Sequence, residues 1–137
     1  MRTDTDISLK CRKIQRIFVS SLLCFQIRNY TPLFFLAVVT GVSMSPSLNP
    51  GDRLVVRRIK HPGVELMGRI VVARDPRENG NLVIKRFAGL DGDSFILLGD
   101  NPEASTDSRF LGSFASDSLM GRVVYRYFPL NAAGRIR

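Results

Sequence analysis

The sequence predicts a mainly β fold: an antiparallel β-domain with a short helical or interfacial segment at its N-terminus. Beyond residue 40, short runs rich in Val, Ile, Leu, Phe and Tyr recur along the chain. Turn-forming residues separate these runs, and no long amphipathic helix lies between them. Together these observations favour two packed or partly closed antiparallel sheets.

Each predicted strand is bounded by turn chemistry. The candidate strands are 53–58, 69–74, 82–87, 94–98 and 121–127. The intervening segments carry combinations such as Pro50-Gly51-Asp52 and Asp91-Gly92-Asp93, which are typical of tight turns. An earlier apolar run, 33–39, also has strand character. Because this run leads directly to Ser43, we interpret it as the strand that delivers that serine.

The length and composition fit one globular domain. A chain of 137 residues is long enough to bury roughly two thirds of the surface that it exposes when unfolded. With 45% hydrophobic and 23% charged residues, wholesale disorder is excluded. We expect a basic and apolar N-terminal segment, 1–32, followed by the β-domain over 33–137.

The N-terminal segment leaves its relation to a membrane open. Residues 1–30 contribute +4 of the net charge of +8, and the apolar run 17–27 is shorter than the roughly 20 residues of a spanning helix. The segment can be a short membrane-touching helix, a buried helix, or an extension ahead of the native start. The location is therefore either cytoplasmic or peripherally membrane-associated, with a membrane-anchored form as the alternative. The basic charge comes without a nucleic-acid-binding motif, so no nucleic-acid partner is expected.

Cysteine and histidine are too scarce for most cofactor chemistry. Cys11 and Cys24 form no CxxC motif, and both precede the motif region. His61 is the one histidine, and it lies in a His-Pro-Gly turn. We therefore expect no metal and no cofactor. For the same reason, a serine nucleophile in this chain is expected to use lysine as its base.

Ser43 and Lys85 are the candidate pair. Ser43 lies in Gly-Val-Ser-Met-Ser-Pro, and Lys85 follows it by 42 residues in Val-Ile-Lys-Arg. A free lysine has a pKa of about 10.4, so it accepts a proton at neutral pH only if burial lowers that pKa. In a strand, Lys85 shares one face with Val83 and Phe87, which favours burial, whereas Arg86 points to the other face and can stay solvated.

Three blocks of sequence resemble the signatures of the signal peptidase I superfamily. They are Gly41–Leu48 with Pro50-Gly51-Asp52, Val83–Arg86, and Gly99–Arg109, and the pair Gly121-Arg122 follows them in the family order. The resemblance implies a fold of the signal peptidase I or LexA-like type and a serine endopeptidase with Ser43 as nucleophile and Lys85 as base.

The same resemblance implies supporting roles for the third block. Ser105 would hydrogen-bond the lysine amine and orient it, and Asp107 and Arg109 would form a structural ion pair near the dyad. The N–H of Ser43 would stabilise the oxyanion. Gly41 stands where some members of the family have a serine that adds a second donor, so that donor is unassigned.

The substrate is expected to be a precursor protein with an N-terminal leader. Residues 99–109 and the segment from Tyr125 to Arg135 look most like the small peptidases that mature nickel-type superoxide dismutase. The alternative is a general signal peptidase I that cleaves exported preproteins at the membrane. A LexA-like repressor would need a DNA-binding domain, for which the first 40 residues show no pattern. An inactive basic interaction domain is left for an assay to exclude.

Overall fold

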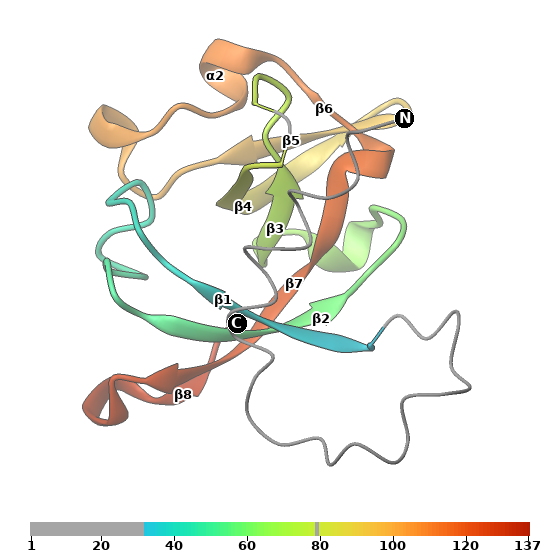
Figure 1. The fold of residues 1–137 in the computed structure, drawn as a ribbon. Helices are drawn as coiled ribbons and strands as arrows, with labels where there is room; N and C mark the ends of the chain where they lie inside the picture. The colour runs from blue at the N-terminus through green and yellow to red at the C-terminus, as the bar shows by residue number, and fades with distance from the viewer. Residues whose placement is uncertain (1–31, 79) are drawn as a thin grey trace, which may run out of the picture. The chain divides into compact units, whose positions relative to one another are not determined.

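The computed structural model describes residues 32–78 and 80–137 (Figure 1). Residues 33–137 form one compact unit, the second of two into which the chain divides. The predictions made for residues 1–31, including the helical or interfacial segment and both cysteines, lie outside the described residues. No helix within the described ranges combines the length and the apolar character that crossing a membrane requires.

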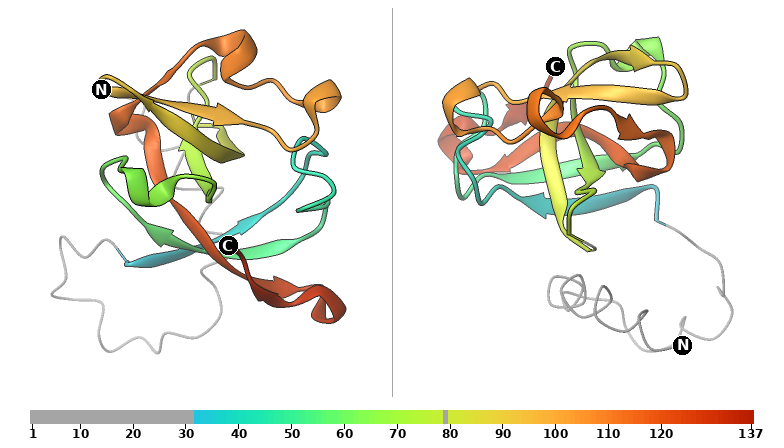
Figure 2. Two further views of the ribbon diagram at one scale, coloured as in Figure 1. Left: turned by 180° about the vertical axis from the view of Figure 1, so that it is seen from behind. Right: turned by 90° about the horizontal axis from the view of Figure 1, so that it is seen from above.

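One antiparallel sheet of eight strands forms the second unit. Its path runs β1-β2-β7-β3-β4-β5-β6, and β8 pairs with β7 beside that path. Figures 1 and 2 show that the sheet curls instead of lying flat. The strands are β1 Phe34–Val38, β2 Arg53–Arg58, β3 Ile70–Arg74, β4 Leu82–Asp91, β5 Ser94–Leu98, β6 Phe114–Ala115, β7 Leu119–Phe128 and β8 Gly134–Arg135.

Helical structure is sparse in the described residues. One short α-helix, α2, spans Ser108–Leu111, and Asp107 caps it by accepting a hydrogen bond from the N–H of Arg109. The remaining helical turns are 3-10 segments. They are η1 Val64–Leu66, η2 Pro102–Ala104, η3 Ser116–Ser118 and η4 Leu130–Ala132.

The predicted mainly β class is confirmed, as a single curled sheet. Strands β2 and β5 have the predicted bounds, and the apolar run before Ser43 forms β1. Strands β4 and β7 are longer than predicted. β4 continues through a glycine-containing stretch that pairing with β5 holds extended. β7 gains Leu119 and Met120 at its start and Phe128 at its end, where Leu119 pairs with β3 and Phe128 with β2. The two-residue strands β6 and β8 and the helix α2 were not predicted.

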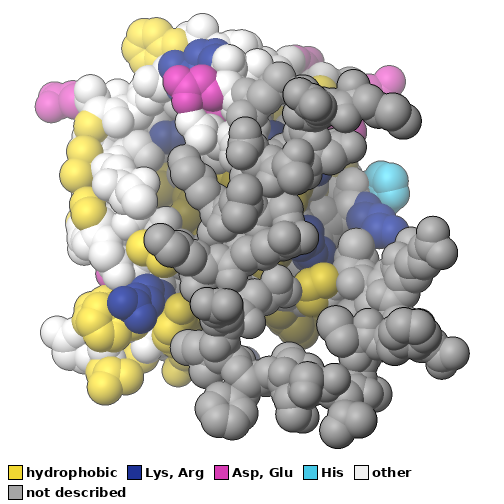
Figure 3. Space-filling model, viewed as in Figure 1, with side chains coloured by type: hydrophobic (Ala, Val, Ile, Leu, Met, Phe, Trp, Pro, Cys, Tyr) yellow, Lys and Arg dark blue, Asp and Glu magenta, His cyan; other side chains and the backbone are white. Residues whose placement is uncertain are grey.

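The core has two parts, and β3 contributes to both. Ile70 and Val72 pack with β1, β2 and β7, whereas Val71 and Ala73 pack with β4, β5 and the phenylalanines of the other half. All four of these β3 residues are buried, which fits a central strand covered on both faces. Hydrophobic side chains also reach the surface at several places (Figure 3).

Glycine at position 121 lets β7 approach β2 closely. A Cβ atom built there would lie 2.4 Å from the backbone oxygen of Arg57. We therefore expect Gly121→Ala to lower the free energy of unfolding by roughly 1–3 kcal/mol, since backbone must shift to admit the methyl group. Gly89→Ala is the matched control, because a Cβ at Gly89 meets no atom within 4 Å. Equal denaturation midpoints for the two variants would contradict this account.

Candidate active site

Ser43 lies in a turn that follows β1 and that is anchored in the core. Met44 and Leu48 of this turn are fully buried among the residues of the first core. The backbone closes on itself where the N–H of Ser45 donates to the oxygen of Val42 at 3.1 Å. Burial of the neighbours on one side therefore fixes a half-exposed Ser43 on the other.

The segment after β5 holds the carbonyl of Ser43. The N–H of Asn101 donates to that oxygen at 2.9 Å. Gly99 lies so close that a Cβ there would be 2.8 Å from the same oxygen and 2.1 Å from Oγ of Ser105. Only a residue without a side chain fits between the two serines. The third block of sequence thus contacts the first directly.

Lys85 is buried in β4 and makes one side-chain hydrogen bond. Its exposed fraction is 4%, and its Nζ donates to Oγ of Ser105 at 2.9 Å. As predicted, it shares a face with Val83 and Phe87, both of which belong to the second core. Its strand partner across the sheet is Val71, which is fully buried. Apolar residues therefore flank the Lys85 side chain.

Asp107 fixes the direction of the Ser105 hydroxyl. Ser105 donates its proton to Oδ2 of Asp107 at 2.8 Å, and the Asp107 side chain is fully buried. A serine hydroxyl has one proton and two lone pairs. Because Asp107 accepts the proton, the lone pairs of Ser105 are available to the Lys85 amine. The result is a directed chain of hydrogen bonds from Lys85 through Ser105 to Asp107.

Asp107 keeps its charge despite its burial. Burial alone would raise the pKa of this carboxyl, but hydrogen bonds from Arg109, from the N–H of Gly99 and from Ser105 hold that pKa well below its usual range. Arg109 makes two of these contacts from its side chain, at 2.6 and 2.9 Å. The predicted ion pair between Asp107 and Arg109 is thus present in the structure.

Burial lowers the pKa of the Lys85 ammonium. The charge of Asp107 opposes this shift, whereas the positive charges of Arg109 and Arg77 add to it, and the net direction is downward. Arg109 therefore has two effects, because it holds Asp107 ionised and also repels a proton on Lys85. Both effects follow from the position of one guanidinium.

Arg86 is a partly exposed side chain that also has a structural role. It points away from Lys85 as predicted, but its guanidinium binds both oxygens of Asp100, at 2.8 and 2.6 Å. It also donates to the carbonyl of Gly68 at 2.6 Å and to Oγ of Ser47 at 3.4 Å. The bidentate ion pair ties β4 to the third block, and the contact with Ser47 reaches the turn that carries Ser43.

Ser43 and Lys85 line the same cavity. It has a volume of about 180 Å³, and its walls come from the end of β1, the following turn and the start of β4. The lining residues are Val38, Val39, Thr40, Gly41, Ser43, Met44, Leu82, Val83, Ile84 and Lys85. No hydrogen bond joins Ser43 to Lys85. Within the described residues, the side chain of Lys85 donates one hydrogen bond, which goes to Ser105. The cavity gives the two groups a common space in which a substrate can lie.

The predicted site residues gather in one place. Ser43 and Lys85 share the cavity, and Ser105, Asp107 and Arg109 form the network behind Lys85. The N–H of Ser43 donates to no group in the described residues, so it is available as an oxyanion donor. Gly41 lines the cavity with open space at its Cβ position, and no second donor is identified.

Sequence reasoning missed the backbone contacts that join the blocks. The Gly99 close approach and the Asn101 hydrogen bond to Ser43 involve main-chain atoms, which no side-chain pattern reveals. The Arg86–Asp100 ion pair could have been inferred, since both residues belong to the blocks that resemble the family signatures. Within the described residues, no group of three or more metal-ligating side chains was found.

The chain matches known proteins along most of its length. The family model for "Signal peptidase, peptidase S26" matches residues 11–96. Mitochondrial ATP-independent inner membrane protease subunit 1b of Arabidopsis thaliana is 32% identical, over 86% of this chain and 84% of its own length. Signal peptidase I of Leptolyngbya laminosa is 27% identical, over 90% and 82%. Inactive signal peptidase IA of Staphylococcus aureus strain N315 is 24% identical, over 88% and 95%.

Replacing Lys85 by an apolar residue of similar length should stabilise the protein. A protonated lysine in an apolar site is costly, so Lys85→Met is expected to raise the free energy of unfolding at pH 7 by about 1–3 kcal/mol. The pKa of Lys85 is lowered in the folded state, and this shift determines how the free energy of unfolding depends on pH. Between that pKa and the unfolded value of about 10.4, the unfolded chain binds more protons, so wild-type stability rises with pH.

The difference in free energy of unfolding between wild type and Lys85→Met should therefore shrink as pH rises from the folded-state pKa of Lys85 to its unfolded value. Urea unfolding at several pH values measures it, and exposed Lys60 provides the control variant Lys60→Met. A Lys85→Met protein less stable than wild type at pH 7 would show that the lysine charge contributes favourably to folding.

Proposed function

The chain belongs to the signal peptidase, peptidase S26 family, and from this premise we propose that it uses Ser43 as nucleophile and Lys85 as general base to remove N-terminal leaders from precursor proteins. As a member of this family it is a serine peptidase of the signal peptidase I type. The observation that carries the assignment of the pair is the burial of Lys85, hydrogen-bonded to Ser105, in the wall of a cavity that Ser43 also lines.

The proposed reaction begins with proton transfer from Ser43 to Lys85. The neutral amine takes the hydroxyl proton as Oγ of Ser43 attacks the scissile carbonyl. The N–H of Ser43 donates to the oxyanion of the tetrahedral intermediate. Lys85 then gives its proton to the leaving amine, and the acyl group stays on Ser43. A water molecule, deprotonated by Lys85, hydrolyses this ester and restores Ser43.

Two open strand edges favour an extended substrate. Among the described residues, β1 pairs only with β2, and residues 82–85 of β4 pair only with β3, because the pairing of β4 with β5 starts at Arg86. Both edges contribute residues to the cavity of Ser43 and Lys85. A peptide strand can add to such edges through main-chain hydrogen bonds. The volume of about 180 Å³ and the aliphatic walls favour small or aliphatic side chains beside the cleaved bond.

Exposed apolar residues extend from the cavity along β1. Phe34, Leu36 and Val38 alternate along the strand with exposed fractions of 43–47%, while Phe35 and Ala37 pack on the core. An apolar strand face next to the cavity suits the apolar core of a leader peptide. It suits a membrane surface equally, which is the setting named for the plant relative.

Two substrates represent the two candidate roles. A nickel superoxide dismutase precursor follows from the likeness of residues 99–109 and of the C-terminal strand region to the proteases that mature it. A secretory precursor follows from the name of the Leptolyngbya relative, signal peptidase I. The two roles share the proposed chemistry and differ in the substrate that is recognised.

Cleavage of these precursors by the purified full chain tests the proposal. Mass spectrometry should find one new N-terminus, and Ser43→Ala and Lys85→Ala should each reduce the rate by at least about a thousandfold while remaining folded. Ser45→Ala, the same change two residues along the turn, should keep most of the activity. Cleavage confined to the dismutase precursor favours maturation of that enzyme, and cleavage of the secretory precursor favours a general signal peptidase. A folded Lys85→Ala protein with wild-type activity would remove lysine from the mechanism.

The pH profile of cleavage should report the lowered pKa of Lys85. A protonated amine cannot accept the Ser43 proton, so the rate should rise with pH through that pKa and level off below the range of a free lysine, about 10.4. His61→Ala is expected to leave the profile unchanged, because His61 does not line the cavity. Loss of the ascending limb in His61→Ala would identify histidine as the base.

A further inference from the structure

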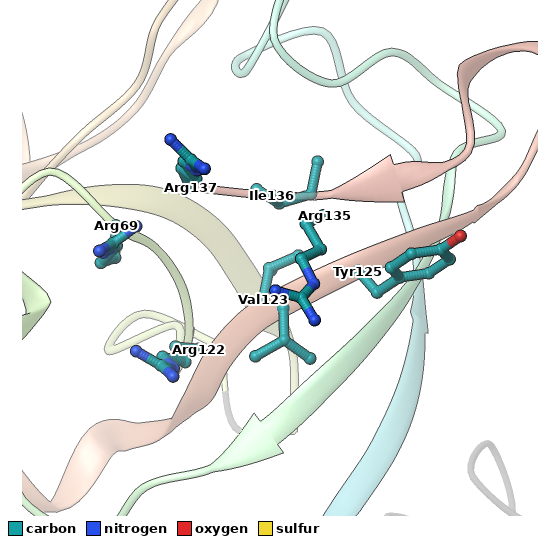
Figure 4. Close-up of a pocket in the computed structure, with 8 residues that line it drawn as sticks. Arg69, Arg122, Val123, Tyr125, Arg135, Ile136 and Arg137 are labelled. Carbon is teal, nitrogen blue, oxygen red and sulfur yellow. The ribbon is translucent and has the colours of Figure 1, made fainter.

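A second cavity lies on another part of the sheet and shares no lining residue with that of Ser43 and Lys85. Its volume is about 430 Å³, and it is formed by β7, β8 and the residues next to them (Figure 4). The lining residues are Arg69, Arg122, Val123, Val124, Tyr125, Arg135, Ile136 and Arg137. A volume of this size falls in the range of small-molecule sites.

The walls of this cavity are strongly basic. Four of the eight lining residues are arginines, and none is Asp or Glu. They come from separate parts of the chain: Arg69 precedes β3, Arg122 lies in β7, and Arg135 lies in β8. Arg122 also stands opposite Arg57 in the pairing of β2 with β7. Like charges placed together in this way repel one another and destabilise the fold.

These arginines have no acidic partner in the part of the chain that the structure describes. Its four ion pairs involve Arg77, Arg86, Arg109 and Arg126. Each of these four guanidinium groups is thus paired with a carboxylate, whereas those of Arg69, Arg122 and Arg135 are not. A concentration of uncompensated guanidinium groups around one cavity attracts anions.

One of these guanidinium groups also contains a buried donor without an acceptor. Nε of Arg122 is the only buried side-chain nitrogen or oxygen atom in the described residues that lacks a hydrogen-bond partner. Leaving a charged donor buried and unsatisfied costs free energy, and natural folds rarely accept that cost. The atom belongs to a residue of the cavity wall (Figure 4), so an anion bound there would lie beside it.

We propose that this cavity is a binding site for a phosphate group carrying at least two negative charges, held by Arg69, Arg122 and Arg135. Guanidinium groups match phosphate oxygens by paired hydrogen bonds, and several of them together favour a multiply charged group over a monovalent anion. Val123 and Ile136 add an apolar wall, which suits the organic part of a phosphate ester. The phosphate can come from a soluble compound or from a phospholipid headgroup.

Binding of inorganic pyrophosphate to the full chain tests the soluble source. The shift of the thermal unfolding midpoint, measured at constant ionic strength with chloride as the comparison anion, gives the affinity. Co-sedimentation with phosphatidylcholine vesicles, with and without phosphatidic acid, tests the headgroup source. Neither readout depends on peptidase activity, so failure here and failure of the proposed function are distinguishable.

Charge-removing variants make the test specific. Arg122→Gln and Arg135→Gln should each weaken pyrophosphate or vesicle binding by about tenfold, since each removes charge-assisted hydrogen bonds. Arg135 is exposed, so its variant should fold even if Arg122→Gln does not. Arg74→Gln is the control, because it makes the same charge change at an exposed position at the far end of β3.

Saturable binding of pyrophosphate that the cavity variants weaken and Arg74→Gln does not would support a soluble ligand. The same dependence with phosphatidic acid vesicles alone would support a headgroup. Absence of binding to both probes, or equal weakening by Arg135→Gln and Arg74→Gln, would overturn the proposal, since a site would then be indistinguishable from general attraction to a basic protein.

Discussion

The candidate active site is arranged around one hydrogen bond, which a buried lysine donates to a serine. A buried carboxylate holds that serine in turn. Lys85 lies among apolar residues of the sheet, where a charged amine is unfavourable, and Ser105 is its one side-chain hydrogen-bond partner in the described part of the chain. Ser105 can accept that hydrogen bond with a lone pair because its hydroxyl group donates its own hydrogen bond to Asp107. Asp107 in turn stays ionised because Arg109 and the N–H of Gly99 bind it. Each group thus sets the state of the next, and the sequence of contacts ends at the surface with Arg109.

The same segment that supplies this chain of contacts also positions Ser43. Between β5 and α2, the N–H of Asn101 holds the Ser43 carbonyl, and Gly99 fits between Ser43 and Ser105. The Arg86–Asp100 ion pair fastens the segment to β4, next to Lys85. The proposed nucleophile and base are therefore connected through one segment, although Ser43 lies in the turn after β1 and Lys85 lies in β4. Preorganisation of this kind is what a serine–lysine pair needs, because neither group is reactive without the other.

Most of the strands and the burial of Lys85 could be predicted from the sequence, because they depend on local patterns of residues. Alternating apolar residues and turn-forming residues located β1, β2, β3 and β5, and the strand face that Lys85 shares with Val83 and Phe87 predicted its burial. The short strands β6 and β8 could not be predicted, since two residues carry no periodicity and these strands exist only through pairing with β5 and β7. The ion pair of Arg86 was not predicted, because its partner, Asp100, is 14 residues away in sequence and is brought near by the fold. The basic cavity between β7 and β8 likewise depends on tertiary structure, since its arginines are spread from residue 69 to residue 137.

The proposed mechanism requires the fold to keep one lysine ready to accept a proton from a serine. The most direct measurement is an NMR titration of the lysine side chains, of which the chain has four, with the Lys85→Met protein used to assign the signal by its loss. Lys85 is expected to lose its proton in a distinctly lower pH range than a free lysine, whose pKa is about 10.4. Titration of Lys85 at or above that value in the folded protein would contradict the account, because the amine would then be charged wherever the enzyme is expected to work.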